Sequence, residues 1–263
     1  MKTRWVLVTG GGQRLGRDIA LAFARARWNV LCHYQTSTQQ AAQTCCDVEQ
    51  LGMKAVALRA DLSVQAERET LISRAIDASN GQLAALVNNA SVFQPDSGMN
   101  FSPQLLQQQL QVNLLAPLHL GSLLAQHAQA ASTAPPPALV QVLDQKVFNL
   151  NPDYFSYTVS KLALERAVAL QAQALAPHVR VTAIAPGLIY LSGPQSADNF
   201  RQAASVNLLH SPTDPADVAR TAVFLAENSS INGVTVCVDK GQHLVPLERD
   251  IMFVVDQVMR NKA

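Results

Sequence analysis

Two ionisable side chains, Tyr157 and Lys161, stand four residues apart in the segment Tyr157-Thr158-Val159-Ser160-Lys161. Residues at this spacing lie on one face of an α-helix. A free tyrosine has a pKa of about 10, and a lysine cation beside it stabilises the phenolate and lowers that pKa. The pair therefore predicts acid–base chemistry, with the tyrosine as proton donor and the lysine adjusting its pKa.

A glycine cluster follows the first β-rich segment, in the sequence TGGGQRLG at positions 9–16. Glycines at 10, 12 and 16 permit a tight turn and let a pyrophosphate approach the backbone. Free amides and the dipole of the following helix favour negative charge there. A strand before the cluster and a helix after it favour a dinucleotide-binding turn over an ordinary tight turn.

The second β-rich segment ends in Tyr34-Gln35-Thr36-Ser37, without the Asp or Glu that usually accepts the ribose 2′-hydroxyl of NAD. An uncharged, hydroxyl-bearing turn near Arg14 suits a 2′-phosphate instead. We therefore expect NADP(H) as the cofactor rather than NAD(H).

The elements that must position these residues alternate between short β-rich runs and amphipathic helical segments, a pattern typical of parallel βαβ units. The expected strands are Trp5–Thr9, Asn29–Tyr34, Ala55–Arg59, Ala85–Asn88, Ala138–Leu143, Val179–Ile184 and Val234–Val238. The expected helices are Leu15–Ala26, Gln39–Leu51, Gln65–Ser79, Pro103–Ala131, Asp153–Ala176 and Pro215–Glu227. Together they predict a doubly wound α/β fold of Rossmann type with a seven-stranded, mostly parallel sheet.

The chain shows no tandem repeat and no Pro/Gly/Ser linker, so residues 1–263 are expected to form a single domain. Residues 188–212 form a long insert with weak periodicity. Because the active site of such a sheet lies beyond the carboxyl ends of its strands, this insert is a candidate substrate lid. A surface excursion without function is the alternative.

The composition excludes several classes of protein. The 263 residues are 48% hydrophobic and 15% charged, and the net charge of +1 includes no basic block, so we expect no nucleic acid partner. No segment reaches the roughly 18 apolar residues that span a bilayer, and no signal peptide is recognisable. Four scattered cysteines predict no disulfide framework, and six histidines without ligand spacing predict no metal. We expect a cytoplasmic protein with a small-molecule substrate.

The TGxxxRxG spacing, together with YxxxK two strands later, resembles the short-chain dehydrogenase/reductase family, in particular its pteridine-reductase branch. In that family the lysine also binds the nicotinamide ribose. The resemblance implies cofactor contacts at Gly10, Gly12, Arg14, Leu15, Gly16, Tyr34, Thr36, Ser37, Asp61, Leu62, Asn89, Ala90, Ser91, Tyr157, Lys161, Pro186 and Gly187.

Two of the implied roles have structural alternatives. Asp61 matches the family aspartate that caps the adenine amino group, but its position also fits a helix N-cap. Asn113 matches the family asparagine that anchors a water beside the lysine and relays protons. Its alternative is a polar residue at a helix kink that bonds to backbone.

Relatives usually carry a serine thirteen residues before the tyrosine, where this chain has Asp144. One interpretation is that the serine was lost and that the enzyme is weak. The other is that the carboxyl group is catalytic, because pteridine reductases combine Asp, Tyr and Lys. A carboxylic acid shielded from water can hold a raised pKa and supply a proton.

The segment Asn89-Ala90-Ser91-Val92-Phe93 resembles the NNASxF segment of pteridine reductases. There the serine hydrogen-bonds the pterin and the aromatic ring stacks on it. A loop-anchoring aromatic is the alternative for Phe93. The substrate contacts implied by the resemblance are Ser91, Phe93, Asp144, Tyr157 and Leu188.

The resemblance implies hydride transfer from NADPH to a C=N bond in a dihydropterin or dihydrofolate-like ring, with Tyr157, Lys161, Asp144 and Asn113 as catalytic residues. It also implies a homodimer or homotetramer through the fourth and fifth helices, whose alanine- and leucine-rich faces suit such a contact. Two other functions stay open: a carbonyl or 3-oxoacyl reductase of the same family, and a non-catalytic NADP(H)-binding regulatory protein.

Overall fold

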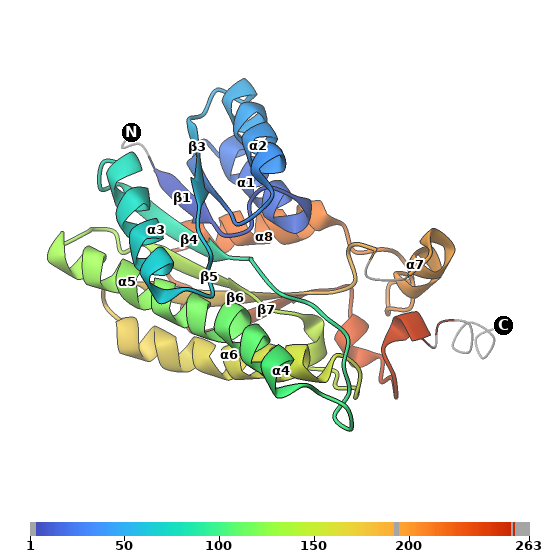
Figure 1. Cartoon of the computed structure of the whole chain (residues 1–263). Helices are drawn as coiled ribbons and strands as arrows, with labels where there is room; N and C mark the ends of the chain where they lie inside the picture. Colours follow the sequence, from blue (N-terminus) through green and yellow to red (C-terminus); the bar gives the residue numbers. More distant parts are fainter. Residues whose placement is uncertain (1–3, 192–194, 254, 256–263) are drawn as a thin grey trace.

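The computed structural model describes residues 4–191, 195–253 and 255. Its strands form one seven-stranded sheet in the order β3-β2-β1-β4-β5-β6-β7 (Figure 1), and all the neighbouring strands are parallel. The strands are β1 Trp5–Val8, β2 Asn29–Tyr34, β3 Ala55–Arg59, β4 Leu83–Asn88, β5 Ala138–Val142, β6 Arg180–Pro186 and β7 Thr235–Val238. The predicted fold class is confirmed.

Helices cover both faces of the sheet, with α1, α2 and α8 on one face and α3, α5 and α6 on the other (Figure 1). The helices are α1 Arg14–Arg25, α2 Thr38–Gln50, α3 Gln65–Ala78, α4 Pro103–Leu110, α5 Ala116–Ala130, α6 Phe155–Leu175, α7 Ala197–Ala203 and α8 Pro215–Glu227. Shorter helical segments carry the label η: the π-helix η1 Gln111–Leu115 and the 3-10 helices η2 Gln145–Val147 and η3 Gln242–Leu244.

Strand β1 explains why the central strands are apolar on both sides. Val6 and Val8 pack into the core beneath α1 and α8, whereas Leu7 packs into the core beneath α3, α5 and α6. Successive strand residues point to opposite faces, so a strand covered on both faces must be apolar throughout.

The strand order reverses at β1, which pairs with β2 on one side and β4 on the other. In a doubly wound sheet the loops diverge at this point and open a crevice. The loops after β1 and β4 are joined at its floor, because the Thr9 hydroxyl accepts hydrogen bonds from the amides of Asn89 at 2.9 Å and Ala90 at 3.0 Å.

The helix expected over Pro103–Ala131 is not continuous. It is interrupted by the π-helical turn Gln111–Leu115. Pro117 has no amide hydrogen, so the usual helical bond to the carbonyl of Asn113 cannot form. The apolar periodicity does not reveal such a turn, and the continuous-helix prediction was wrong here.

The insert predicted at 188–212 contains the short helix α7, and its residues 192–194 lie outside the described part of the chain. Ala203 and Val206 of this insert form a small separate core with Ile251 and Val255 near the C-terminus. Among the described residues, no helix is long and apolar enough to cross a membrane.

Candidate active site

A cavity of about 640 Å³ lies beyond the carboxyl ends of the strands. This size is ordinary for a cofactor or small-molecule site. Nearly every predicted site residue lines it: Gly10, Arg14, Leu15, Gly16, Tyr34, Thr36, Ser37, Asp61, Leu62, Asn89, Ala90, Ser91, Phe93, Asp144, Tyr157, Lys161, Pro186, Gly187 and Leu188. Gly12 and Asn113 do not appear in this lining.

The turn after β1 fits a pyrophosphate. Gly10 has a φ of 64°, and a Cβ on Gly16 would come within 2.0 Å of the Gly10 carbonyl oxygen, so both positions require glycine. No side chain of the described residues caps the first turn of α1, and that turn carries no acidic residue. Its amides are available to an anion.

Gly12 has a packing role, and its predicted cofactor contact stays a prediction. A Cβ there would lie 3.0 Å from the backbone nitrogen of Ala41 in α2. The absence of a side chain at Gly12 allows α2 to pack closely against the turn.

A residue that the sequence did not indicate, His33, holds the turn in place. Its Nδ1 accepts from the Gly10 amide at 3.0 Å, and its Nε2 lies 3.1 Å from the Ala60 carbonyl oxygen. These partners require a neutral ring that donates from Nε2. Burial lowers the pKa of His33 to about 4, although the Ala60 carbonyl acts in the opposite direction. No catalytic motif contains this histidine, so only its position in the fold identifies it.

At the end of β3, Asp61 is not the N-cap of the following helix, because α3 begins at Gln65 with Val64 at the cap position. Its carboxylate accepts hydrogen bonds from the amide and the hydroxyl of Ser63 at 2.8 and 2.7 Å. Burial acts to raise the pKa of Asp61, but these hydrogen bonds outweigh it and lower the pKa. Asp61 is therefore an ionised acceptor in the cavity wall.

Arg14 reaches the start of the 188–212 insert. Its guanidinium donates to the Leu191 carbonyl at 2.8 Å and lies 5.2 Å from the centre of the Tyr190 ring. The Tyr190 hydroxyl in turn donates to Asp18 of α1. These contacts join the insert to the first turns of α1, across the opening of the nucleotide cleft.

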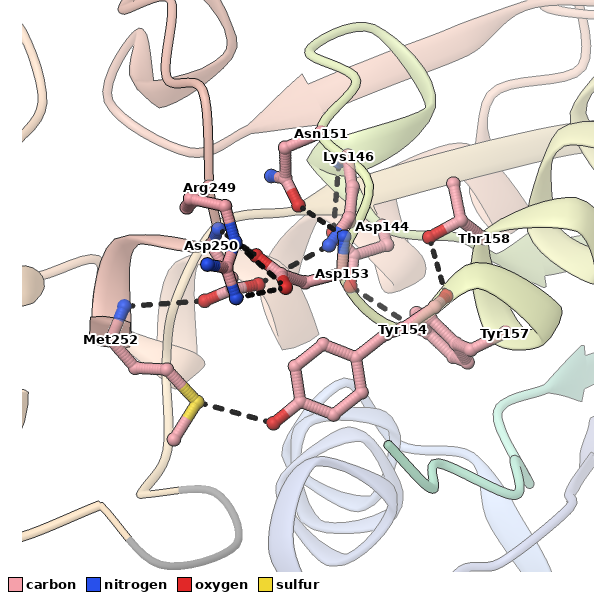
Figure 2. A network of polar contacts seen from close by, with 10 residues as sticks. All are labelled: Asp144, Lys146, Asn151, Asp153, Tyr154, Tyr157, Thr158, Arg249, Asp250 and Met252. Atoms are coloured by element: carbon pink, nitrogen blue, oxygen red, sulfur yellow. Dashed lines mark hydrogen bonds and ion pairs between the residues drawn. The ribbon is translucent and has the colours of Figure 1, made fainter. Parts of the chain in front are cut away.

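Asp144 and Tyr157 meet at the floor of the cavity. The Tyr157 hydroxyl donates to Asp144 Oδ2 at 3.0 Å, and Figure 2 shows the two side chains facing each other. Asp144 caps η2, where its Oδ1 accepts from the Lys146 amide at 2.8 Å. The Lys161 ammonium donates to the Val142 carbonyl at 2.8 Å and lies 5.8 Å from the centre of the Tyr157 ring.

Burial dominates the ionisation of these groups. It raises the pKa of Tyr157 well above its usual value, and the negative charge of Asp144 adds to this. The pKa of Lys161 falls to about 8 because of burial, although Asp144 opposes the fall. Burial also raises the pKa of Asp144, against hydrogen bonds from Lys146 and Tyr157. The pKa of Tyr157 is therefore raised rather than lowered as expected, and the hydroxyl holds its proton firmly.

Asn113 projects from the π-helical turn and is completely buried. Its Oδ1 accepts from the Val92 amide at 2.8 Å and from the Ser91 hydroxyl at 3.1 Å, while its Nδ2 donates to the Val92 carbonyl at 2.9 Å. A further hydrogen bond of 3.1 Å reaches Ser160 in α6. Asn113 therefore fixes the loop that carries Ser91 and Phe93.

Phe93 presents an aromatic surface to the cavity and is 41% exposed. Its ring stacks on Tyr154 with centres 4.2 Å apart, and it meets the edge of Tyr157 at 4.7 Å. Tyr154 stands at the start of α6 with a φ of 54°. Tyr154 is followed four residues later by Thr158 rather than by a lysine, and it contributes an aromatic wall to the cavity.

The C-terminal segment supplies a second group of residues that the sequence did not indicate. Asp250, Ile251 and Met252 line the same cavity, and Asp250 pairs with Lys146 (Figure 2). No local motif could have shown this, because the partners lie 104 positions apart in the chain. Within the described residues, no group of His, Cys, Asp or Glu is arranged to hold a metal ion.

A glycine turn with free helix amides, and a Tyr/Lys pair at the ends of a parallel sheet, define a nucleotide-dependent oxidoreductase of the Rossmann class. A family model described as "Enoyl-(Acyl carrier protein) reductase" matches residues 12–243. This chain belongs to the short-chain dehydrogenase/reductase family.

Individual relatives agree along almost the whole chain. The crystal structure of FolM alternative dihydrofolate reductase 1 from Brucella canis, complexed with NADP, is 34% identical and superposes with a TM-score of 0.86, covering 92% of this chain and 95% of that one. Dihydromonapterin reductase from Citrobacter koseri is 27% identical over 243 residues, 91% of this chain and 96% of that protein. The Enterobacter dihydromonapterin reductase is 26% identical over 251 residues, 92% of this chain and 97% of that protein.

Proposed function

We propose that this chain is an NADPH-dependent reductase of a C=N bond in a pterin or dihydrofolate-like ring. Relatives named for dihydromonapterin and dihydrofolate reduction support the substrate class, and the NADP in the Brucella structure supports the cofactor. The observation that carries the proposal is the 3.0 Å hydrogen bond between Tyr157 and Asp144.

This hydrogen bond suits reduction of a C=N bond, which adds a hydride to carbon and a proton to nitrogen. A tyrosine hydroxyl both donates and accepts. Tyr157 therefore can give its proton to the substrate nitrogen while it takes one from protonated Asp144, which avoids a buried phenolate. The raised pKa of Asp144 favours the protonated state that this step needs.

NADPH supplies the hydride when it is bound. The amides of the first turn of α1 would hold its pyrophosphate, and Asp61 would accept from the adenine amino group. Tyr34, Thr36 and Ser37 form the polar turn proposed to receive the 2′-phosphate, with Arg14 nearby. Lys161 would bind the nicotinamide ribose.

The substrate side follows from the aromatic wall. Phe93 would stack on a flat heteroaromatic ring, held by Ser91, while Tyr154 supports Phe93 from behind. Leu188 would close the site as the first residue of the proposed lid at 188–212.

Three wider proposals accompany this function. We infer that residues 1–263 form a single nucleotide-binding domain. We also infer that the protein is cytoplasmic, and that it assembles as a homodimer or homotetramer through the long helices α5 and α6.

The test uses purified protein with NADPH and dihydrobiopterin or dihydrofolate, and follows consumption of NADPH. We expect turnover that falls to background in Tyr157→Phe. Wild-type turnover no greater than that of the variant would refute the pterin assignment. Reduction of ketone or 3-oxoacyl substrates instead would indicate a carbonyl reductase. Tight NADPH binding without any reduction would indicate a regulatory protein.

A further inference from the structure

A second buried cation lies beside the catalytic pair. The side chain of Lys146 is only 5% exposed, and the backbone amide of the same residue is bonded to Asp144. Lysine carries its charge on a long flexible stem, so the ammonium can turn toward the carboxylate two residues earlier. A buried charge must be paired. The partner that Lys146 takes therefore decides the charge next to Asp144.

Asp250 is that partner. Its Oδ2 lies 3.3 Å from the Lys146 ammonium, which also sits 5.3 Å from the centre of the Tyr154 ring. This places the ammonium on the outer wall of the cavity, in a contact with the C-terminal segment. The Oδ2 of Asp144 is left to Tyr157.

Asp153 fixes the position of Asp250. Its carboxylate accepts hydrogen bonds from Arg249 Nε at 3.0 and 2.8 Å and from Arg249 Nη2 at 2.7 Å, and another from the Asp250 amide at 2.7 Å (Figure 2). A bidentate arginine bond together with a backbone bond sets both the place and the direction of the segment. Asp153 stands just before α6, so the clamp ties the C-terminal segment to the helix that carries Tyr157.

We propose that Asp250 is a positioning residue: it binds the Lys146 ammonium and thereby leaves Asp144 free to share the Tyr157 proton. Asp153 and Arg249 act through it, by docking the C-terminal segment. This inference rests on the proposed proton transfer from Tyr157.

The charges that face Asp144 determine in which direction its pKa should shift. They come from Lys146 in η2, from Tyr157 and Lys161 in α6, and from Asp250 in the C-terminal segment. Asp250 raises the pKa of Asp144, and Lys146 lowers it. Without Asp250 the ammonium would turn to Asp144, lower its pKa further and compete with Tyr157 for its oxygen.

The variant Asp250→Asn tests this in the full chain. We expect the alkaline limb of the kcat profile to move down by about one pH unit, which is about a tenfold loss of kcat at a fixed pH on that limb. The double variant Lys146→Met with Asp250→Asn should recover most of this loss, because the competing cation is gone. A double variant as slow as Asp250→Asn overturns the proposal, and so does an unmoved profile.

Arg249→Gln, a change on a half-exposed side chain, should give the same shift in weaker form. Asp217→Asn is the matched control, since Asp217 pairs with Arg220 on α8 outside the cavity. A crystal structure of Asp250→Asn gives a readout that needs no activity: we expect the Lys146 ammonium within hydrogen-bonding distance of Asp144. An ammonium that stays in place refutes the inference, even if the protein proves not to reduce pterins.

Discussion

Asp144 occupies the position at which the family resemblance implies a serine. A serine hydroxyl can orient a substrate carbonyl but has no acidic proton to give at neutral pH. A carboxyl group whose pKa is raised by burial can supply a proton through Tyr157. This difference suits a substrate whose nitrogen must be protonated.

Asp144→Asn keeps the shape of the side chain and removes its proton. We expect kcat for a dihydropterin to fall by about 100-fold, within the range of general acid catalysis. The dissociation constant for NADPH should not change. Stopped-flow reduction and NADPH titration would measure the two effects, and an unaltered kcat would mean that Asp144 only caps η2.

The burial of Lys161 predicts a pH dependence of the enzyme's activity. Because burial lowers its pKa to about 8, the free enzyme loses this charge as the pH rises through that value. Without the charge, the proposed contact of Lys161 with the nicotinamide ribose weakens. We expect kcat/KM for NADPH, which reports the free enzyme, to decline above that pH. A profile that stays level well beyond it would contradict the prediction.

The burial of His33 predicts a pH dependence of the free energy of unfolding. The folded protein keeps the ring neutral with a pKa of about 4, whereas the unfolded chain takes up a proton below 6.5. The free energy of unfolding should therefore decrease as the pH falls from 6.5 to 4, by about 3 kcal/mol from this group. His33→Gln can keep both hydrogen bonds and does not titrate, so this component should vanish. Urea unfolding across the pH range would test it, and parallel curves for both proteins would contradict it.

At the scale of elements, the π-helical turn Gln111–Leu115 matters most. A regular helix would carry Asn113 in another direction, away from the loop after β4. The extra residue in the turn aims its amide at both backbone groups of Val92. The turn therefore connects the α4–α5 segment to the aromatic wall of the cavity.

Asn113→Ala would leave the partly buried backbone amide and carbonyl of Val92 without their Asn113 partners. We expect the free energy of unfolding to fall by about 1–3 kcal/mol. The KM for the pterin should rise about tenfold, equivalent to about 1.4 kcal/mol, because Ser91 and Phe93 lose their fixed position. Gln126→Ala, on the exposed side of α5, serves as the control. An unchanged KM would show that the loop holds its shape without Asn113.

At the scale of the whole molecule, the cavity is closed by parts of the chain far apart in sequence. Among the described residues, the C-terminal segment donates a hydrogen bond to Asp153 and accepts hydrogen bonds from Lys146, Tyr154 and Asn199 of α7. These partners surround the proposed substrate side, whereas the glycine turn lies with α1. The two ends of the cavity are thus built by separate parts of the fold.

A chain that stops after Pro246 tests this division. We expect NADPH binding to survive, because the turn after β1 and the end of β2 are intact. Pterin turnover should fall at least 100-fold in kcat/KM, since Asp250 and the apolar contacts of Ile251 with α7 are lost. Calorimetric titration with NADPH and steady-state assays would measure both. Equal losses of binding and turnover would show that the segment stabilises the whole fold instead.

Particular residues show how far the sequence was informative. Alternating apolar runs predicted the seven-stranded sheet, because the pattern of a buried strand is local. The glycine turn and the Tyr157–Lys161 spacing could also be recognised in the sequence, since each is a short local motif. The helix break at Asn113 was only an alternative to its proton-relay role, because apolar periodicity is nearly the same for an α-helix with one extra residue.

The sequence alone determined the class of fold, the position of the nucleotide turn and the identity of the Tyr/Lys pair, because these depend on neighbours within a few residues. Only the tertiary structure decided that Asp144 touches Tyr157, that burial raises rather than lowers the pKa of Tyr157, and that Asp250 takes the Lys146 ammonium. Burial and long-range ion pairs arise from segments brought together by folding, and no local pattern records them.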